Sequence, residues 1–153
     1  MSSREYSVKL ESSSPEMTEA IGFNIGKKLK AGDITALYGE LGAGKTTMVK
    51  GIARAFGIEN RDVTSASFTI IAGYKSDPAF YHIDLYRIET DEDLDNTGIW
   101  DCIGGDSISV IEWAEKIEKE LPEKTIKVNI GTVDSNKREI TIEGISEKDW
   151  HNL

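Results

Sequence analysis

GELGAGKTT, the stretch Gly39–Thr47, carries the strongest pattern in this sequence. The spacing of Gly39, Gly44, Lys45 and Thr46 matches the phosphate-binding pattern G-x-x-x-x-G-K-[ST]. Glycine loses more backbone freedom on folding than any other residue, so a loop that concentrates glycines needs a compensating role. A preformed cradle of backbone N–H groups around phosphate oxygens would supply that role. The alternative is a flexible glycine turn that leads into a helix.

The flanking sequence favours the phosphate cradle. The apolar stretch ITALY (Ile34–Tyr38) predicts a short strand that runs into the loop, and apolar residues at helical spacing predict a helix that ends at Gly57. A helix N-terminus after such a loop directs N–H groups and the positive end of its dipole at an anion. In this arrangement the Lys45 ammonium lies near the outer phosphates and the Thr46 hydroxyl can bind Mg²⁺. The residues predicted to bind nucleotide are Gly39, Glu40, Leu41, Gly42, Ala43, Gly44, Lys45, Thr46 and Thr47.

Two carboxylates are candidates for chemistry beside this loop. Alternation in the strand-like stretch AFYHIDLYRI places His82, Asp84 and Tyr86 on one face. A buried carboxylate is costly without a partner, and Mg²⁺ or a Mg²⁺-bound water would be one; alternatively, Asp84 faces solvent from an edge strand. Glu112 lies at the carboxyl end of a second apolar strand, SISVIEW, where parallel sheets bind their ligands. We expect His82 to be a packed or hydrogen-bonded residue rather than a ligand.

The rest of the chain alternates strand and helix patterns, which indicates an α/β fold. We find no internal repeat and no second-domain boundary, so the sequence predicts a single domain over residues 1–153. The further predicted elements are a strand at Tyr6–Leu10, a helix from Pro15 to Gly32 capped by Ser13 or Ser14, a hairpin of Ser67–Tyr74 and Ala79–Ile88, an acidic helix within Thr90–Gly98, a helix at Ala114–Leu121 and a hairpin of Thr125–Val133 and Arg138–Glu143.

Charge and composition restrict the function classes. The chain has 27 acidic and 18 basic residues and a net charge of −9, so its surface repels a nucleic acid backbone. We therefore expect no direct, tight binding of nucleic acid. The one cysteine, Cys102, excludes an intrachain disulfide and is expected to act as a small apolar residue. No apolar run is long enough to span a membrane and the first residues do not resemble a signal peptide, so we expect a cytoplasmic protein.

Other phosphate-loop proteins fit this sequence less well. GTPases recognise guanine through Asn-Lys-x-Asp, but the nearest match, Asn136–Glu139, has Glu in place of Asp and falls in a predicted hairpin turn. Small-molecule kinases usually carry a lid with several arginines that hold the transferred phosphate. The arginines of this chain do not cluster in the sequence.

GELGAGKTT, TSASF, YHIDLYR and IEWAEK, in this order and spacing, resemble the TsaE (YjeE) family of bacterial ATPases. The resemblance covers nearly the whole chain. It implies a P-loop NTPase-like, three-layer α/β fold with a mixed central sheet and added antiparallel hairpins. It also implies an ATP- and Mg²⁺-dependent protein that acts with TsaB and TsaD in making threonylcarbamoyladenosine beside the tRNA anticodon.

The resemblance assigns roles to particular residues. Lys45 and Thr46 would bind phosphates and Mg²⁺, and Asp84 and Glu112 would be metal-binding or catalytic carboxylates. We favour Glu112 on the metal and Asp84 on the attacking water, although the sequence allows the reverse. Trp113 matches a family tryptophan near the site and the partner surface. Further candidates are Ser14, Thr18 and Arg138 for contacts with the base, and Ser65, Ser67 and Phe68 for a switch-like loop.

The switch-like loop departs from the family pattern. The family usually has Ser-Pro-Thr followed by an aromatic residue, where this chain has Ser65-Ala66-Ser67-Phe68. Loss of the proline loosens the backbone, whereas Ser67 keeps a hydroxyl. Two other function classes stay open at this point. One is a small-molecule kinase, and the other is a module that uses ATP only to assemble a complex.

Overall fold

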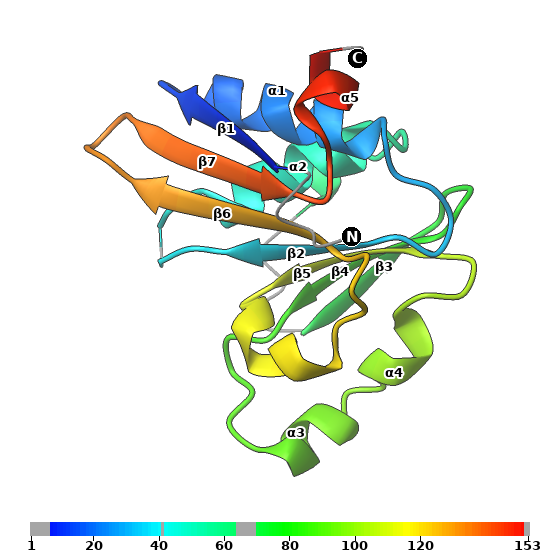
Figure 1. Ribbon diagram of the computed structural model, residues 1–153. Coiled ribbons are helices and arrows are strands. Elements are labelled where there is room, and N and C mark those ends of the chain that lie inside the picture. Colours follow the sequence, from blue (N-terminus) through cyan, green and yellow to red (C-terminus); the bar gives the residue numbers. More distant parts are fainter. Residues whose placement is uncertain (1–6, 41, 64–69, 152–153) are drawn as a thin grey trace.

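The centre of the computed structural model, which describes residues 7–40, 42–63 and 70–151, is a seven-stranded sheet. Its strand order is β1-β7-β6-β2-β5-β4-β3, so β2 lies in the middle (Figure 1). The strands are β1 (Ser7–Ser12), β2 (Ile34–Tyr38), β3 (Ile71–Tyr74), β4 (Phe80–Asp84), β5 (Ile108–Glu112), β6 (Ile126–Thr132) and β7 (Arg138–Glu143).

The sheet is mixed, as the family resemblance implies. Strands β4, β5, β2 and β6 are parallel to their neighbours in that series. Antiparallel pairs extend both edges: β3 pairs with β4, β7 pairs with β6, and β1 pairs with β7. The two predicted hairpins and the α/β class are therefore confirmed. The parallel strands all end at one edge of the sheet, which is where the glycine loop follows β2.

Helices cover both faces of the sheet, which makes three layers. In Figure 1 α1 and α2 lie above the sheet, and α3 and α4 lie below it. The helices are α1 (Pro15–Gly26), α2 (Lys45–Arg54), α3 (Asp91–Asp95), α4 (Ile99–Cys102) and α5 (Glu147–His151), with 3₁₀ turns η2 (Asn60–Asp62) and η3 (Ala114–Glu120). Ser14 caps α1, since its hydroxyl accepts the Met17 N–H.

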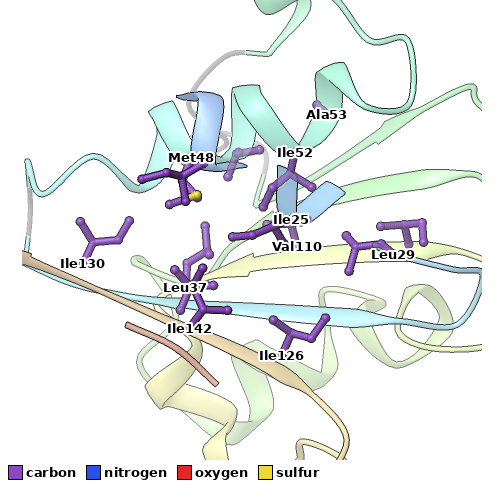
Figure 2. Packing of buried hydrophobic residues seen from close by; sticks show 14 of the residues in the cluster. Ile25, Leu29, Leu37, Met48, Ile52, Ala53, Val110, Ile126, Ile130 and Ile142 are labelled. Carbon is purple, nitrogen blue, oxygen red and sulfur yellow. The ribbon is translucent and has the colours of Figure 1, made fainter. Parts of the chain in front are cut away.

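Alternate residues of the central strands supply two separate apolar cores. On β2, Leu37 packs with α1 and α2, whereas Ala36 faces α4 and η3. Figure 2 shows the first core, where Met48 and Ile52 of α2 pack with Ile25 and Leu29. Burial on both faces is the usual setting of parallel strands and explains why β2 and β5 have near-continuous apolar sequences.

Helices α1 and α2 approach each other closely at three glycines. A Cβ atom on Gly51 would lie 2.0 Å from the Glu19 carbonyl oxygen, and one on Gly22 would lie 2.5 Å from the Met48 carbonyl oxygen. A Cβ atom on Gly26 would meet the Ile52 carbonyl oxygen at 2.7 Å. The backbones can approach this closely only without side chains, so the glycines allow α2 to pack directly against α1.

Replacing Gly51 by alanine should destabilise the fold. Alanine in an exposed helix interior normally stabilises by about 1 kcal/mol over glycine. Here the clash with the Glu19 carbonyl reverses the sign, and we expect a net loss of about 2 kcal/mol. The midpoint of thermal unfolding should fall by roughly 4–8 °C. The control is Gly131→Ala on β6, where the nearest atom lies 3.7 Å from the added Cβ. An unchanged midpoint for Gly51→Ala would contradict the close approach.

Helix α1 ends at Gly26 rather than at Gly32 as predicted. After Gly26 the chain tightens, because Lys28 donates its N–H to the Ile25 carbonyl at 2.9 Å and Leu29 donates to the Gly26 carbonyl at 3.1 Å. Hydrogen bonds of this 3₁₀ type, between the N–H of residue i+3 and the carbonyl of residue i, commonly satisfy the last carbonyls of a helix. Leu29 stays buried, so the apolar face continues past the helix itself.

Strand β4 ends at Asp84 rather than continuing to Ile88. The Asp84 Oδ1 atom accepts the N–H of Tyr86 at 3.0 Å, a turn typical of aspartate, and this bond stops the strand. Tyr86 is therefore not part of β4, although it lines the same cavity as Asp84. The strand lies between β5 and β3, so the alternative of an edge-strand Asp84 is wrong.

Other boundaries differ less. The helix predicted at Ala114–Leu121 is not an α-helix but the 3₁₀ segment η3, which is bent at Ile117. The acidic helix predicted within Thr90–Gly98 is the short helix α3. Sequence patterns also missed η2, α4 and α5. Within the described part of the chain, no helix has the length and apolar character needed to cross a membrane.

Candidate functional site

The glycine loop joins the carboxyl end of β2 to the start of α2, as predicted. Gly44 is the N-cap of α2, and its φ of 108° lies in the left-handed region that favours glycine. No side chain caps this helix. The first N–H groups of α2 are therefore left for a ligand, which suits an anion beside the positive end of the helix dipole.

Lys45 is buried, with only 5% of its surface exposed. Its ammonium donates hydrogen bonds to the carbonyls of Gly39 and Glu40, and it lies 3.9 Å from the centre of the Trp113 ring. Burial lowers the pKa of Lys45, while the negative charges of Glu112, Glu115 and Asp84 oppose that shift. The contacts hold one cation beside the loop.

The two predicted carboxylates come from neighbouring parallel strands and meet at the same edge. Asp84 of β4 is directly opposite Glu112 of β5 in the register, and both side chains are buried. The Thr46 hydroxyl lies 3.4 Å from Glu112 Oε1. The structure thus brings Lys45 and Thr46 of the loop together with both acids.

His82 and Glu112 form a buried pair. The His82 Nε2 atom lies 2.5 Å from Glu112 Oε2, and the His82 side chain is completely buried. The prediction that His82 is packed and hydrogen-bonded is confirmed. Its partner was not predictable, because the contact depends on which strands are neighbours.

Trp113 follows Glu112 and takes a backbone conformation that is unusual for a residue with a side chain. Its φ of 58° and ψ of 41° are left-handed, which is a strained arrangement of the kind found near functional sites. This turn places the ring beside Lys45 and against Tyr86, with 5.1 Å between the aromatic centres. Lys116 holds the turn that follows β4 in place, since its ammonium donates hydrogen bonds to the carbonyls of Tyr86 and Ile88.

These residues enclose a cavity of about 390 Å³. Its lining consists of Gly42, Gly44, Lys45, Thr46, Thr47, Asp84, Tyr86, Arg87, Glu112 and Trp113. The sequence analysis missed Tyr86 and Arg87 as lining residues. Their position two and three residues after Asp84 in YHIDLYR was a usable signal.

A second, smaller cavity of about 160 Å³ also borders the glycine loop and shares Gly42, Gly44 and Thr47 with the first. Ser14, Thr18 and Arg138, which come from distant parts of the sequence, all line it together with Ala43 and Gly44. The Arg138 Nε atom donates to the Ala43 carbonyl at 3.0 Å. Ser135 and Asn136 also line this cavity and were not among the predicted residues.

The donor atoms of the larger cavity fit Mg²⁺. One hydroxyl and two carboxylates are hard oxygen ligands, which Mg²⁺ prefers, and it usually binds one or two carboxylates together with phosphates and water. The described residues contain no group of three or more His, Cys, Asp or Glu side chains that could hold a metal alone. Leu41, Ser65, Ser67 and Phe68 lie outside the described residues.

A family model and similar relatives among known proteins point to the same family. A family model described as threonylcarbamoyl adenosine biosynthesis protein TsaE matches residues 12–140. The chain is 38% identical to the tRNA threonylcarbamoyladenosine biosynthesis protein TsaE of Treponema pallidum, over 86% of this chain and 96% of that protein. It is 36% identical to the Bacillus subtilis protein of the same name, over 92% and 88% of the two chains.

The fold agrees with this result. The crystal structure of YdiB from Bacillus subtilis superimposes with a TM-score of 0.72 and 34% identity, covering 93% of this chain and 88% of that one. The residues that the family model matches include both the glycine loop and the two carboxylates. The chain therefore belongs to the TsaE family of tRNA threonylcarbamoyladenosine biosynthesis proteins.

Proposed function

We propose that this chain is a Mg²⁺-dependent ATPase that acts with TsaB and TsaD in tRNA threonylcarbamoyladenosine modification. One observation carries the proposal: a single cavity unites Lys45 and Thr46 of the glycine loop with Asp84 and Glu112 of two neighbouring strands. Phosphate transfer to water needs a phosphate cradle, a cation, a metal site and a group that orients water. The cavity contains a residue for each of these roles.

The residues would divide the work as follows. The loop N–H groups and Lys45 would bind the phosphates, and the Thr46 hydroxyl and Glu112 would hold Mg²⁺. Asp84, which lines the same cavity, would orient the attacking water. Mg²⁺, when bound with ATP, would neutralise charge that develops on the phosphate oxygens. The hydroxyl of Thr46 lies within 3.4 Å of Glu112, which supports the assignment of this acid to the metal.

The smaller cavity is the proposed place of the base. It adjoins the glycine loop, Glu112 is not among its lining residues, and it holds polar groups from Ser14, Thr18 and Arg138. An adenine or its ribose there would keep the phosphates on the loop. Asn136 also lines this cavity, so the hairpin turn between β6 and β7 contributes to it.

Replacing Arg138 by lysine should weaken ATP binding by roughly tenfold, the effect of losing one net hydrogen bond from a charged donor. Lysine keeps the charge but cannot reproduce the Nε–H bond to the Ala43 carbonyl, so the loop is held less firmly. Isothermal titration with a nonhydrolysable ATP analogue measures the change. Arg61→Lys is the matched control, because Arg61 is exposed and lines neither cavity. Equal affinity of both variants would remove Arg138 from the binding site.

We also propose that the isolated chain hydrolyses ATP slowly and that TsaB and TsaD accelerate it. Among the described residues, Arg87 is the one arginine that lines the larger cavity. It is exposed to solvent, so it is not held on the phosphates by burial. The net charge of −9 disfavours tight tRNA binding by this chain alone, which leaves that task to partners. Its one cysteine and its family support a cytoplasmic location.

The test is an assay of phosphate release with the chain alone and with TsaB and TsaD. Slow release that rises in the complex supports the proposal. Transfer of the phosphate to a small molecule would instead identify a kinase. ATP binding without any release, in a complex that still modifies tRNA, would identify an assembly module and contradict the hydrolytic role.

A further inference from the structure

We propose that His82 is a positioning residue for Glu112, so that its imidazole sets which carboxylate oxygen faces the metal side of the site. The inference rests on the proposed function for the role of Glu112. The contact itself does not depend on that function. It is a close polar contact within the buried part of the site, at 2.5 Å between Nε2 and Oε2.

The position of His82 in the sheet explains the contact. Residues Phe80, His82 and Asp84 of β4 lie on the face toward α1 and α2, and Val110 and Glu112 of β5 lie on the same face. His82 is opposite Val110 in the register, two residues before the Asp84–Glu112 pair. The Glu112 side chain reaches back toward His82. The carboxylate therefore has a donor on the core side and the Thr46 hydroxyl on the cavity side.

The surroundings of the ring select one tautomer. His82 is completely buried, and its Nδ1 atom has no hydrogen-bond partner among the described residues. A proton on Nδ1 would be a buried donor without an acceptor, which is costly. A proton on Nε2 is donated to Glu112 Oε2 instead. We therefore infer the tautomer protonated at Nε2, with a bare Nδ1.

This arrangement fixes the direction of the Glu112 carboxylate. With Oε2 occupied by the His82 N–H, Oε1 is the oxygen left for the cavity, and the Thr46 hydroxyl lies at nearly the same distance from both oxygens, 3.4 and 3.5 Å. Outer partners that orient ligand carboxylates and imidazoles typically change metal affinity or activity by roughly 10- to 100-fold when they are lost. His82 would change the affinity for Mg²⁺ and the turnover rate through Glu112, without touching the nucleotide.

Two substitutions separate positioning from packing. The amide nitrogen of glutamine reaches about as far along the side chain as Nε2, whereas that of asparagine reaches only as far as Nδ1. We expect His82→Asn to raise the Mg²⁺ concentration for half-maximal activity by roughly tenfold and to lower kcat by a similar factor, with KM for ATP little changed. His82→Gln should recover most of the loss. The control is Thr35→Val, which changes another buried polar residue on the same face of the sheet and should leave both parameters unchanged.

A measurement on the free protein tests the contact without any activity. Long-range ¹H–¹⁵N spectra distinguish the tautomers, and the chain has only two histidines, so His151→Gln assigns the signals. A proton on Nε2 in the wild type supports the proposal, and a proton on Nδ1 overturns it even if the chain is an ATPase. Equal Mg²⁺ dependence of His82→Asn and wild type, with the Nε2 proton present, would show that the contact is only structural. If the wild type hydrolyses no ATP, the proposed function fails while the tautomer result still stands.

Discussion

Lys45→Ala should lower ATP hydrolysis at least about 100-fold, because it removes the buried cation of the glycine loop. In the structure this ammonium is held by the carbonyls of Gly39 and Glu40 and by the Trp113 ring, directly beside the loop N–H groups. A bound phosphate would offer the same ammonium a far stronger, charge-assisted partner. ATP binding, measured by titration calorimetry, should weaken together with the rate.

The fold should tolerate this change. Burial lowers the pKa of Lys45, so the folded chain holds this charge less favourably than water does. Removing the charge relieves this cost and offsets part of the packing lost with the side chain, so the thermal midpoint should change little. Lys50→Ala is the matched control, since Lys50 belongs to the same helix but lines neither cavity. Normal affinity and turnover of Lys45→Ala, beside an equally normal Lys50→Ala, would refute the phosphate role of the loop.

Glu112→Gln and Asp84→Asn should each reduce hydrolysis about 100-fold or more while ATP binding stays within a few-fold of wild type. The loop contacts to phosphate remain in both variants, and removing a negative charge cannot repel ATP. Each substitution leaves an amide oxygen that can still accept a hydrogen bond, from His82 in Glu112→Gln and from the Tyr86 N–H in Asp84→Asn. The losses would thus reflect charge and metal binding rather than misfolding.

Magnesium dependence separates the two acids. If Glu112 binds the metal, Glu112→Gln should require more Mg²⁺ for the same rate. Asp84→Asn should instead stay slow at saturating Mg²⁺, because the attacking water is no longer oriented. Glu115→Gln is the control, since Glu115 contributes to the field at Lys45 but does not line the cavity. Wild-type hydrolysis by both variants in the presence of TsaB and TsaD would make the two acids structural.

The sequence predicted those parts of the site whose geometry is local. The strand, the glycine loop and the start of α2 follow one another along the chain, so a fixed spacing was enough to identify Lys45 and Thr46. Glu112 was identified by the general rule that ligands lie at the carboxyl ends of parallel strands. In each case the information lay within a few residues or in a rule that holds for every parallel sheet.

The parts that were missed depend on contacts distant in sequence or on competing side-chain bonds. The His82–Glu112 pair requires β4 and β5 to be neighbours and one particular rotamer of Glu112. The predicted strand beyond Asp84 failed because the Asp84 carboxylate bonds the Tyr86 N–H, and an apolar pattern does not record that choice. The left-handed backbone of Trp113 likewise has no signal in a residue type that normally avoids it.

The strand order also has a consequence for how the chain folds during synthesis. The first strand, β1, pairs with β7, and central β2 pairs with β5 and β6, so these partners are all made long after the strands they join. Ser7 is opposite Glu143 in the register. In a chain growing on the ribosome, β1 therefore cannot pair until β7 has emerged. Likewise β2 cannot pair until β5 and β6 have emerged. Such non-local pairing slows folding and leaves apolar strands exposed meanwhile, so we expect aggregation to compete with folding during synthesis.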